Sequence, residues 1–161
     1  MLNEETHHKL VAMKLHGMAA AFDEHLKDRR HDKLPFEERF GMMVDREWTE
    51  RQQRRLKRRL SSARLRESAC VEDIDYRHPR NLDRSVIQRL STCRWVAEHE
   101  NVVIVGPTGL GKTWLGCALA NKACRDGYSA IYARLPRLFH ALQIARADGS
   151  YMKELGRMAK A

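Results

Sequence analysis

The chain has 161 residues, enough for one ordinary domain or for a small domain followed by part of another. A hydrophobic content of 43% argues against wholesale disorder, and no apolar run reaches the length of a transmembrane helix. The start lacks a secretion signal, and the four cysteines lack the spacing of a zinc site or a disulfide framework. We therefore expect a cytoplasmic protein with reduced, packed thiols.

The net charge of +9 comes almost entirely from one segment. Between residues 51 and 66 there are eight basic residues and no acidic one. Charge concentrated in this way favours a polyanionic partner, nucleic acid before membrane, although basic residues also suit a solvated helix face. We predict non-specific contacts to the DNA backbone by Arg51, Arg54, Arg55, Lys57, Arg58, Arg59, Arg64 and Arg66.

Helical spacing dominates the first 68 residues. Apolar side chains recur every three or four positions from Thr6 to about Arg30, and Gly17 within this stripe could divide it into two helices. Pro35 occupies a natural first-turn position and opens a further helix, which is apolar up to Trp48 and basic beyond it. We predict an all-helical N-terminal domain over residues 1–68 that ends in a basic helix.

Residues 69–161 show the pattern of an α/β domain. An ordered connector at 71–80 and a helical pattern at 82–98 precede the β-branched run Asn101–Val105, which predicts a strand buried on both faces. A helix follows and ends at Asp126-Gly127, where glycine suits the position just after a helix. A second strand is predicted at Ser129–Ala133, followed by helices at about 137–147 and 151–159.

The segment between the first strand and its helix is Gly106-Pro107-Thr108-Gly109-Leu110-Gly111-Lys112-Thr113. It matches the phosphate-binding (Walker A) pattern Gly-x-x-x-x-Gly-Lys-[Ser/Thr] in full, between a predicted strand and a predicted helix. The glycines allow backbone N–H groups to converge on phosphate oxygens at the positive end of the helix. Lys112 would contact the β- and γ-phosphates of ATP, and the hydroxyl of Thr113 would bind Mg²⁺. A glycine turn without a ligand is the weaker interpretation.

With this loop in place, the chain resembles the IstB-like transposition helper ATPases, relatives of the DnaC helicase loader within the AAA+ superfamily. The resemblance covers nearly the whole chain, including Leu10–Ala19, the basic stretch 51–66 and the connector Val71–Tyr76. Its most specific parts are residues 101–115, 118–119 and 124–128. Trp114 departs from the family, which usually has histidine directly after the loop.

The resemblance implies an ATPase that multimerises on DNA and engages a transposase, with Gly106–Thr113 as the ATP site. It also implies an acidic Walker B strand, yet no apolar run ending in paired acids occurs after Thr113. We therefore expect a truncated chain that binds ATP and Mg²⁺ without useful hydrolysis.

In the family's sheet the two predicted strands are not neighbours. We accordingly expect residues 69–161 to form an incomplete parallel-sheet P-loop (AAA+) domain of low stability, because its strands would lack partners.

Two alternatives stay open. A helicase-loader-like ATP-binding protein of DNA replication would use its helical part to grip another protein. A small nucleotide kinase shares the loop but normally begins close to it, whereas here the loop begins at residue 106. The acidic residues before the loop show no spacing that ties them to a phosphate, and we interpret them as structural: Glu67, Glu72, Asp73 and Asp75.

Overall fold

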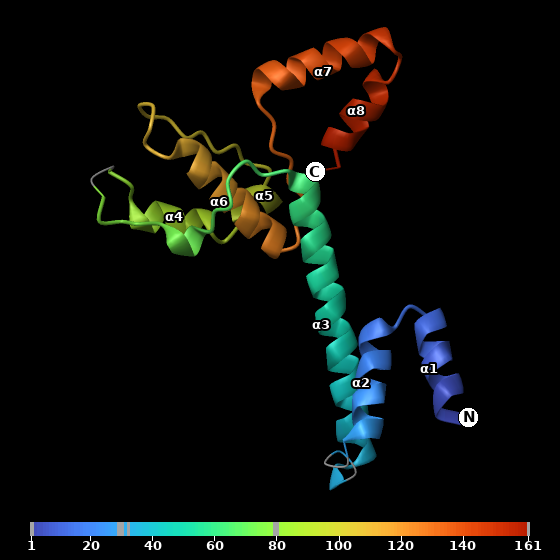
Figure 1. The fold of residues 1–161 in the computed structure, drawn as a ribbon. Helices are drawn as coiled ribbons and strands as arrows, with labels where there is room; N and C mark the ends of the chain where they lie inside the picture. Colours follow the sequence, from blue (N-terminus) through green and yellow to red (C-terminus); the bar gives the residue numbers. More distant parts are fainter. Residues whose placement is uncertain (1, 29–30, 32, 79–80, 161) are drawn as a thin grey trace. The chain divides into compact units, whose positions relative to one another are not determined.

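The computed structural model describes residues 2–28, 31, 33–78 and 81–160. The chain divides into two compact units, Met1–Arg55 and Leu56–Ala161 (Figure 1). No helix within the described ranges is both long and apolar enough to span a bilayer. The sequence predicted a domain boundary at residue 68 from a change in composition. The division after Arg55 reflects only which residues pack together, so the predicted boundary stays a prediction.

The first unit is built from α1 (Leu2–Ala12), α2 (His16–Lys27) and the first part of α3 (Phe36–Ala63). The chain breaks between α1 and α2 at residues 13–15, where Lys14 adopts a left-handed φ of 61°. The break suggested at Gly17 therefore occurs earlier, and Gly17 is the second residue of α2. The helix predicted to open at Pro35 is confirmed, since α3 begins at the next residue.

Gly17 allows α2 to pack tightly against α3. A Cβ at this position would lie 2.9 Å from the Cα of Glu47 and 3.0 Å from the carbonyl oxygen of Arg46. α2 has no side-chain cap of its own at Leu15. The buried carboxylate of Glu47 instead accepts from the first N–H groups of α2, which would otherwise lack partners.

The second unit contains the end of α3 and a series of shorter helices. These are η2 (Val71–Asp73), α4 (Arg84–Leu90), α5 (Arg94–Ala97), α6 (Lys112–Arg125), α7 (Leu135–Ala147) and α8 (Tyr151–Met158). The helical pattern predicted for residues 82–98 forms two helices, because Cys93 adopts a left-handed φ of 56° between them. The indole N–H of Trp95 donates to the carbonyl of Leu90 across this break, at 2.9 Å.

The core of the second unit forms around α6. Cys117 and Ala118 of this helix are buried against Ala69, and the side chains of Leu65, Val71, Trp114 and Tyr132 pack around them. Cys93 and Cys124 are also buried, and burial raises the pKa of both thiols, so they stay neutral. The three buried cysteines thus pack as small apolar side chains, as the sequence suggested.

The C-terminal end of α6 is fixed by backbone and side-chain hydrogen bonds. Gly127 has a φ of 102°, and the N–H groups of Gly127 and Tyr128 donate to the carbonyls of Cys124 and Ala123. This is a Schellman motif, which confirms the stop predicted at Asp126-Gly127. The guanidinium of Arg59 donates to the carbonyl of Cys124 at 2.8 Å and anchors α3 to the same end.

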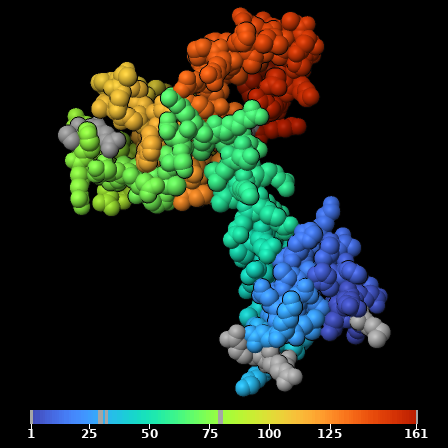
Figure 2. All heavy atoms as spheres, viewed as in Figure 1, coloured from blue at the N-terminus to red at the C-terminus, as the bar shows by residue number. Residues whose placement is uncertain are grey.

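The prediction of a parallel sheet is wrong. The described part of the chain contains no strand. Residues 101–106 exchange no backbone hydrogen bond with any other described residue, and Val103 and Val105 are 80% and 87% exposed. The segment of the chain around residue 105, coloured yellow, lies at the surface in Figure 2. Residues 129–133 form one such bond, from the N–H of Tyr132 to the carbonyl of Ala63. A strand needs a neighbour for its N–H and C=O groups, and neither segment has one here.

Candidate nucleotide-binding loop and basic surface

The loop Gly106–Thr113 leads directly into α6. Residues 108–110 form a turn, and Gly111 precedes the helix in a left-handed conformation with a φ of 84°. Gly106 and Gly109 have φ values of 153° and 89°, so all three glycines of the motif occupy a region that other residues rarely adopt. The loop and its helix therefore form locally without the strand that was expected to precede them.

The backbone N–H groups of this loop have no acceptor in the described part of the chain. Within the described ranges, none of the N–H groups of residues 106–113 donates a hydrogen bond to the protein. The ammonium of Lys112 donates to the carbonyl of Pro107 at 2.6 Å, which ties the lysine back across its own loop. Free N–H groups and a cation at the start of a helix of 14 residues are the elements of a phosphate site.

A cavity of about 480 Å³ lies beside the loop. Leu110, Gly111 and Lys112 form one side of it, and Ile74, Leu82, Trp114 and Leu115 supply apolar walls. The carboxylate-bearing residues Asp73 and Asp75 of the connector also line it. The volume is in the range of small-molecule sites, and the mixture of apolar walls with a few polar groups is typical of them.

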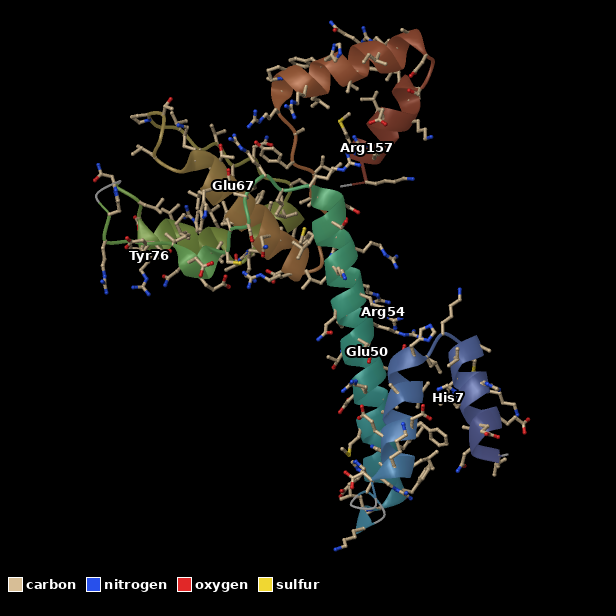
Figure 3. All side chains as sticks on the ribbon, viewed as in Figure 1. His7, Glu50, Arg54, Glu67, Tyr76 and Arg157 are labelled. Carbon is tan, nitrogen blue, oxygen red and sulfur yellow. The ribbon has the colours of Figure 1, made fainter. Side chains whose placement is uncertain are left out.

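The predicted DNA-contacting residues fall into two groups. Four have acceptors within the protein: Arg51 and Arg54 pair with Glu47, Arg59 donates to Cys124, and Arg66 lies 3.4 Å from Glu67. Figure 3 labels Arg54 on α3. Arg55, Lys57, Arg58 and Arg64 are exposed and have no acidic partner in the described part of the chain. The second group is therefore free to contact an external anion.

Comparison with known proteins adds independent information. The family described as IstB-like ATP binding protein matches residues 8–161. An insertion sequence ATP-binding protein of Sinorhizobium fredii is 46% identical over 153 residues, which are 95% of this chain and 62% of the relative. The ATP-binding protein of insertion sequence IS1162 from Pseudomonas fluorescens is 43% identical over 161 residues, or 99% of this chain and 70% of the relative.

The chain belongs to the IstB-like ATP binding protein family. A more distant relative is the ATP-binding protein of insertion sequence IS21 from Pseudomonas aeruginosa, which is 30% identical over 152 residues. The chain spans 62% of the length of the Sinorhizobium relative and 57% of the length of the Pseudomonas aeruginosa one.

Two carboxylates of the connector lie beside the loop, which the sequence pattern did not predict. The structural role assigned to Asp73 and Asp75 stays a prediction, and both residues line the cavity that Lys112 also lines. Glu72 does have a structural contact, because both of its oxygens accept from Arg125 at 2.8 Å, which holds the pKa of Glu72 below its ordinary value. No local pattern distinguishes these neighbours, since only the fold brings the connector to the loop.

Trp114 is a further residue that the fold assigns to this site. It lines the cavity and also packs against the buried core around Ala118. Its indole therefore connects the wall of the candidate site with the interior of the unit.

Proposed function

We propose that this chain is an ATP-binding component of the transposition apparatus of an insertion sequence. The observation that carries the proposal is the loop Gly106–Thr113, whose N–H groups have no acceptor among the residues that the structure describes and lie at the start of α6. The relatives support it, because they are described as insertion sequence ATP-binding proteins.

The residues present fit a bound nucleotide with Mg²⁺. The free N–H groups of residues 106–113 and the ammonium of Lys112 would bind the phosphates, and the hydroxyl of Thr113 would be a ligand of the metal. Pro107 contributes no N–H but supplies the carbonyl that holds Lys112 in place. The apolar walls at Ile74, Leu82 and Trp114 would hold the base.

Titration calorimetry of the full chain with ATP and Mg²⁺ tests this proposal. Lys112→Ala should abolish measurable binding, and Thr113→Ala should remove mainly the dependence of affinity on Mg²⁺. Lys153→Ala is a matched control, because this lysine is exposed on α8 and lines neither the loop nor its cavity. Equal ATP affinity in wild type and Lys112→Ala would contradict the proposal.

We further propose that the exposed basic residues of α3 contact DNA. Arg55, Lys57 and Arg58 lie within two turns of this helix and have no competing acid in the described part of the chain. A phosphate-backbone surface predicts binding without sequence preference that weakens steeply with salt. Duplex affinity that stayed constant between low and moderate salt would exclude this surface as the contact.

The protein partners proposed from the family are a transposase and further copies of the same chain, in the cytoplasm. Pull-down of the chain against the transposase of its element and against a replicative helicase discriminates the transposition role from a helicase-loading one. Capture of the helicase alone would favour the second role.

A further inference from the structure

A second cavity of the Leu56–Ala161 unit is lined by five arginines. It has a volume of about 470 Å³ and lies among the end of α3, the segment before α7 and the last turn of α8. The arginines are Arg64, Arg66, Arg134, Arg137 and Arg157. Figure 3 labels Arg157 on α8 and Glu67 in the segment that follows α3. Three of the five follow the nucleotide-binding loop in sequence, far from the basic stretch at 51–66.

The backbone brings the two sets of arginines together. The N–H of Tyr132 donates to the carbonyl of Ala63 at 2.8 Å, which holds the segment before α7 against the end of α3. Arg64 then ends α3 with a left-handed φ of 49°. Arg64 and Arg134 are each within two residues of this bond, so they reach the same cavity.

The positive charge of this cavity is only partly balanced. Arg66 lies 3.4 Å from Glu67, and Arg157 pairs with Glu154 at 2.9 Å. In the described part of the chain, Arg64, Arg134 and Arg137 have no acidic partner. Arg134 and Arg137 also flank the start of α7, whose first turn contains no acidic residue. Cations are disfavoured at a helix N-terminus, so this placement has a cost that a bound anion would offset.

We propose that this arginine-lined cavity binds the phosphodiester backbone of a nucleic acid strand. The guanidinium group forms paired hydrogen bonds with phosphate oxygens, and several arginines around one cavity match the repeating charge of a backbone. The inference rests on the proposed DNA contact and extends it, since Arg64 and Arg66 belong to both. It adds Arg134, Arg137 and Arg157, which place part of the DNA surface after the ATP loop in the chain.

Fluorescence anisotropy of the full chain with a short labelled DNA duplex tests the assignment. Arg134→Gln with Arg137→Gln should weaken binding about tenfold at low salt and reduce the slope of log affinity against log salt by about 2, or about 0.9 for each phosphate that is no longer neutralised. Lys33→Gln with Lys153→Gln removes the same charge from exposed sites outside the cavity and should leave both quantities nearly unchanged. Arg134→Lys with Arg137→Lys keeps both positive charges and should restore the slope. This result would show that the glutamine variant binds weakly because it lost charge and not because it failed to fold.

A second variant separates this inference from the function on which it rests. Arg55→Gln, Lys57→Gln and Arg58→Gln together test the helix surface. If this triple variant binds weakly while the Arg134/Arg137 variant binds like wild type, the cavity assignment is wrong and the helix contact stands. If neither variant weakens binding, the DNA contact itself is wrong. Polyglutamate serves as a second probe that carries carboxylates in place of phosphates. If the Arg134/Arg137 variant loses polyglutamate binding while its DNA binding stays unchanged, the cavity binds an acidic protein and the proposal is overturned.

Discussion

The carboxylate of Glu47 accepts a hydrogen bond from the backbone N–H of Gly17 at 2.8 Å, across the contact between α3 and α2. The same oxygen accepts from Met18 at 3.3 Å, and the other oxygen accepts from Arg51 and Arg54. One buried acid therefore caps α2 and binds two residues of the basic stretch. The packing of the first unit and the charge of α3 are coupled through this side chain.

Gly17→Ala should destabilise the first unit by about 1–3 kcal/mol, because the added methyl group would overlap the backbone of α3. Gly41→Ala is the matched control on α3, where a Cβ has no neighbour within 4 Å. It should stabilise the helix by about 0.5–1 kcal/mol. Urea unfolding followed by the fluorescence of Trp48 measures both. If Gly17→Ala and Gly41→Ala changed the free energy of unfolding equally, the close approach of α2 to α3 would be absent.

Glu47→Gln should lower the free energy of unfolding by about 1–3 kcal/mol at neutral pH, since it removes a charged acceptor from a buried network. Burial alone would raise the pKa of Glu47, but hydrogen bonds from Arg51, Met18 and Gly17 outweigh burial and lower it. The stabilisation is therefore fully present above the unfolded pKa of about 4.3 and is lost as the pH falls through the lower folded pKa. The difference between wild type and variant should shrink in acid. Glu38→Gln, at an exposed position of α3, is the control and should leave the free energy of unfolding at neutral pH within about 0.5 kcal/mol of wild type.

Arg59 and Arg58 are adjacent but should behave differently. Arg59→Met should destabilise the second unit by about 1–2 kcal/mol, because it removes the hydrogen bond to the carbonyl of Cys124. Arg58→Met should leave stability unchanged and weaken DNA binding, because Arg58 is exposed and unpaired within the described chain. Thermal unfolding and anisotropy with labelled duplex separate the two effects. A loss of stability in Arg58→Met would refute this division.

Val103→Asp should change stability by less than about 0.5 kcal/mol, because the side chain is 80% exposed and packs against little. A valine in a buried strand would not tolerate the charge. Leu119→Ala provides the contrast: this residue of α6 is 4% exposed, and its truncation should cost about 2–4 kcal/mol. A large loss in Val103→Asp would indicate that residues 101–105 are covered in solution.

Local sequence determined the features that depend on short-range backbone geometry. The sequence predicted the glycine turn of Gly106–Thr113, the helix that follows it and the end of that helix at Gly127. Such predictions succeed because turns and helix ends need particular residues at fixed spacing. The basic stretch 51–66 was equally plain in the sequence. The apolar run Asn101–Val105 was misleading, since β-propensity becomes a strand only when a neighbouring strand completes its hydrogen bonds.

Tertiary structure alone decided which distant residues meet. Glu47 reaches the N-terminus of α2, Asp73 reaches the cavity of Lys112, and Arg134 joins Arg64 through the bond between Tyr132 and Ala63. No motif or regular sequence spacing links the two residues of any of these pairs. They arise because buried contacts and unpaired N–H or C=O groups must be satisfied by whichever side chains the packing brings near.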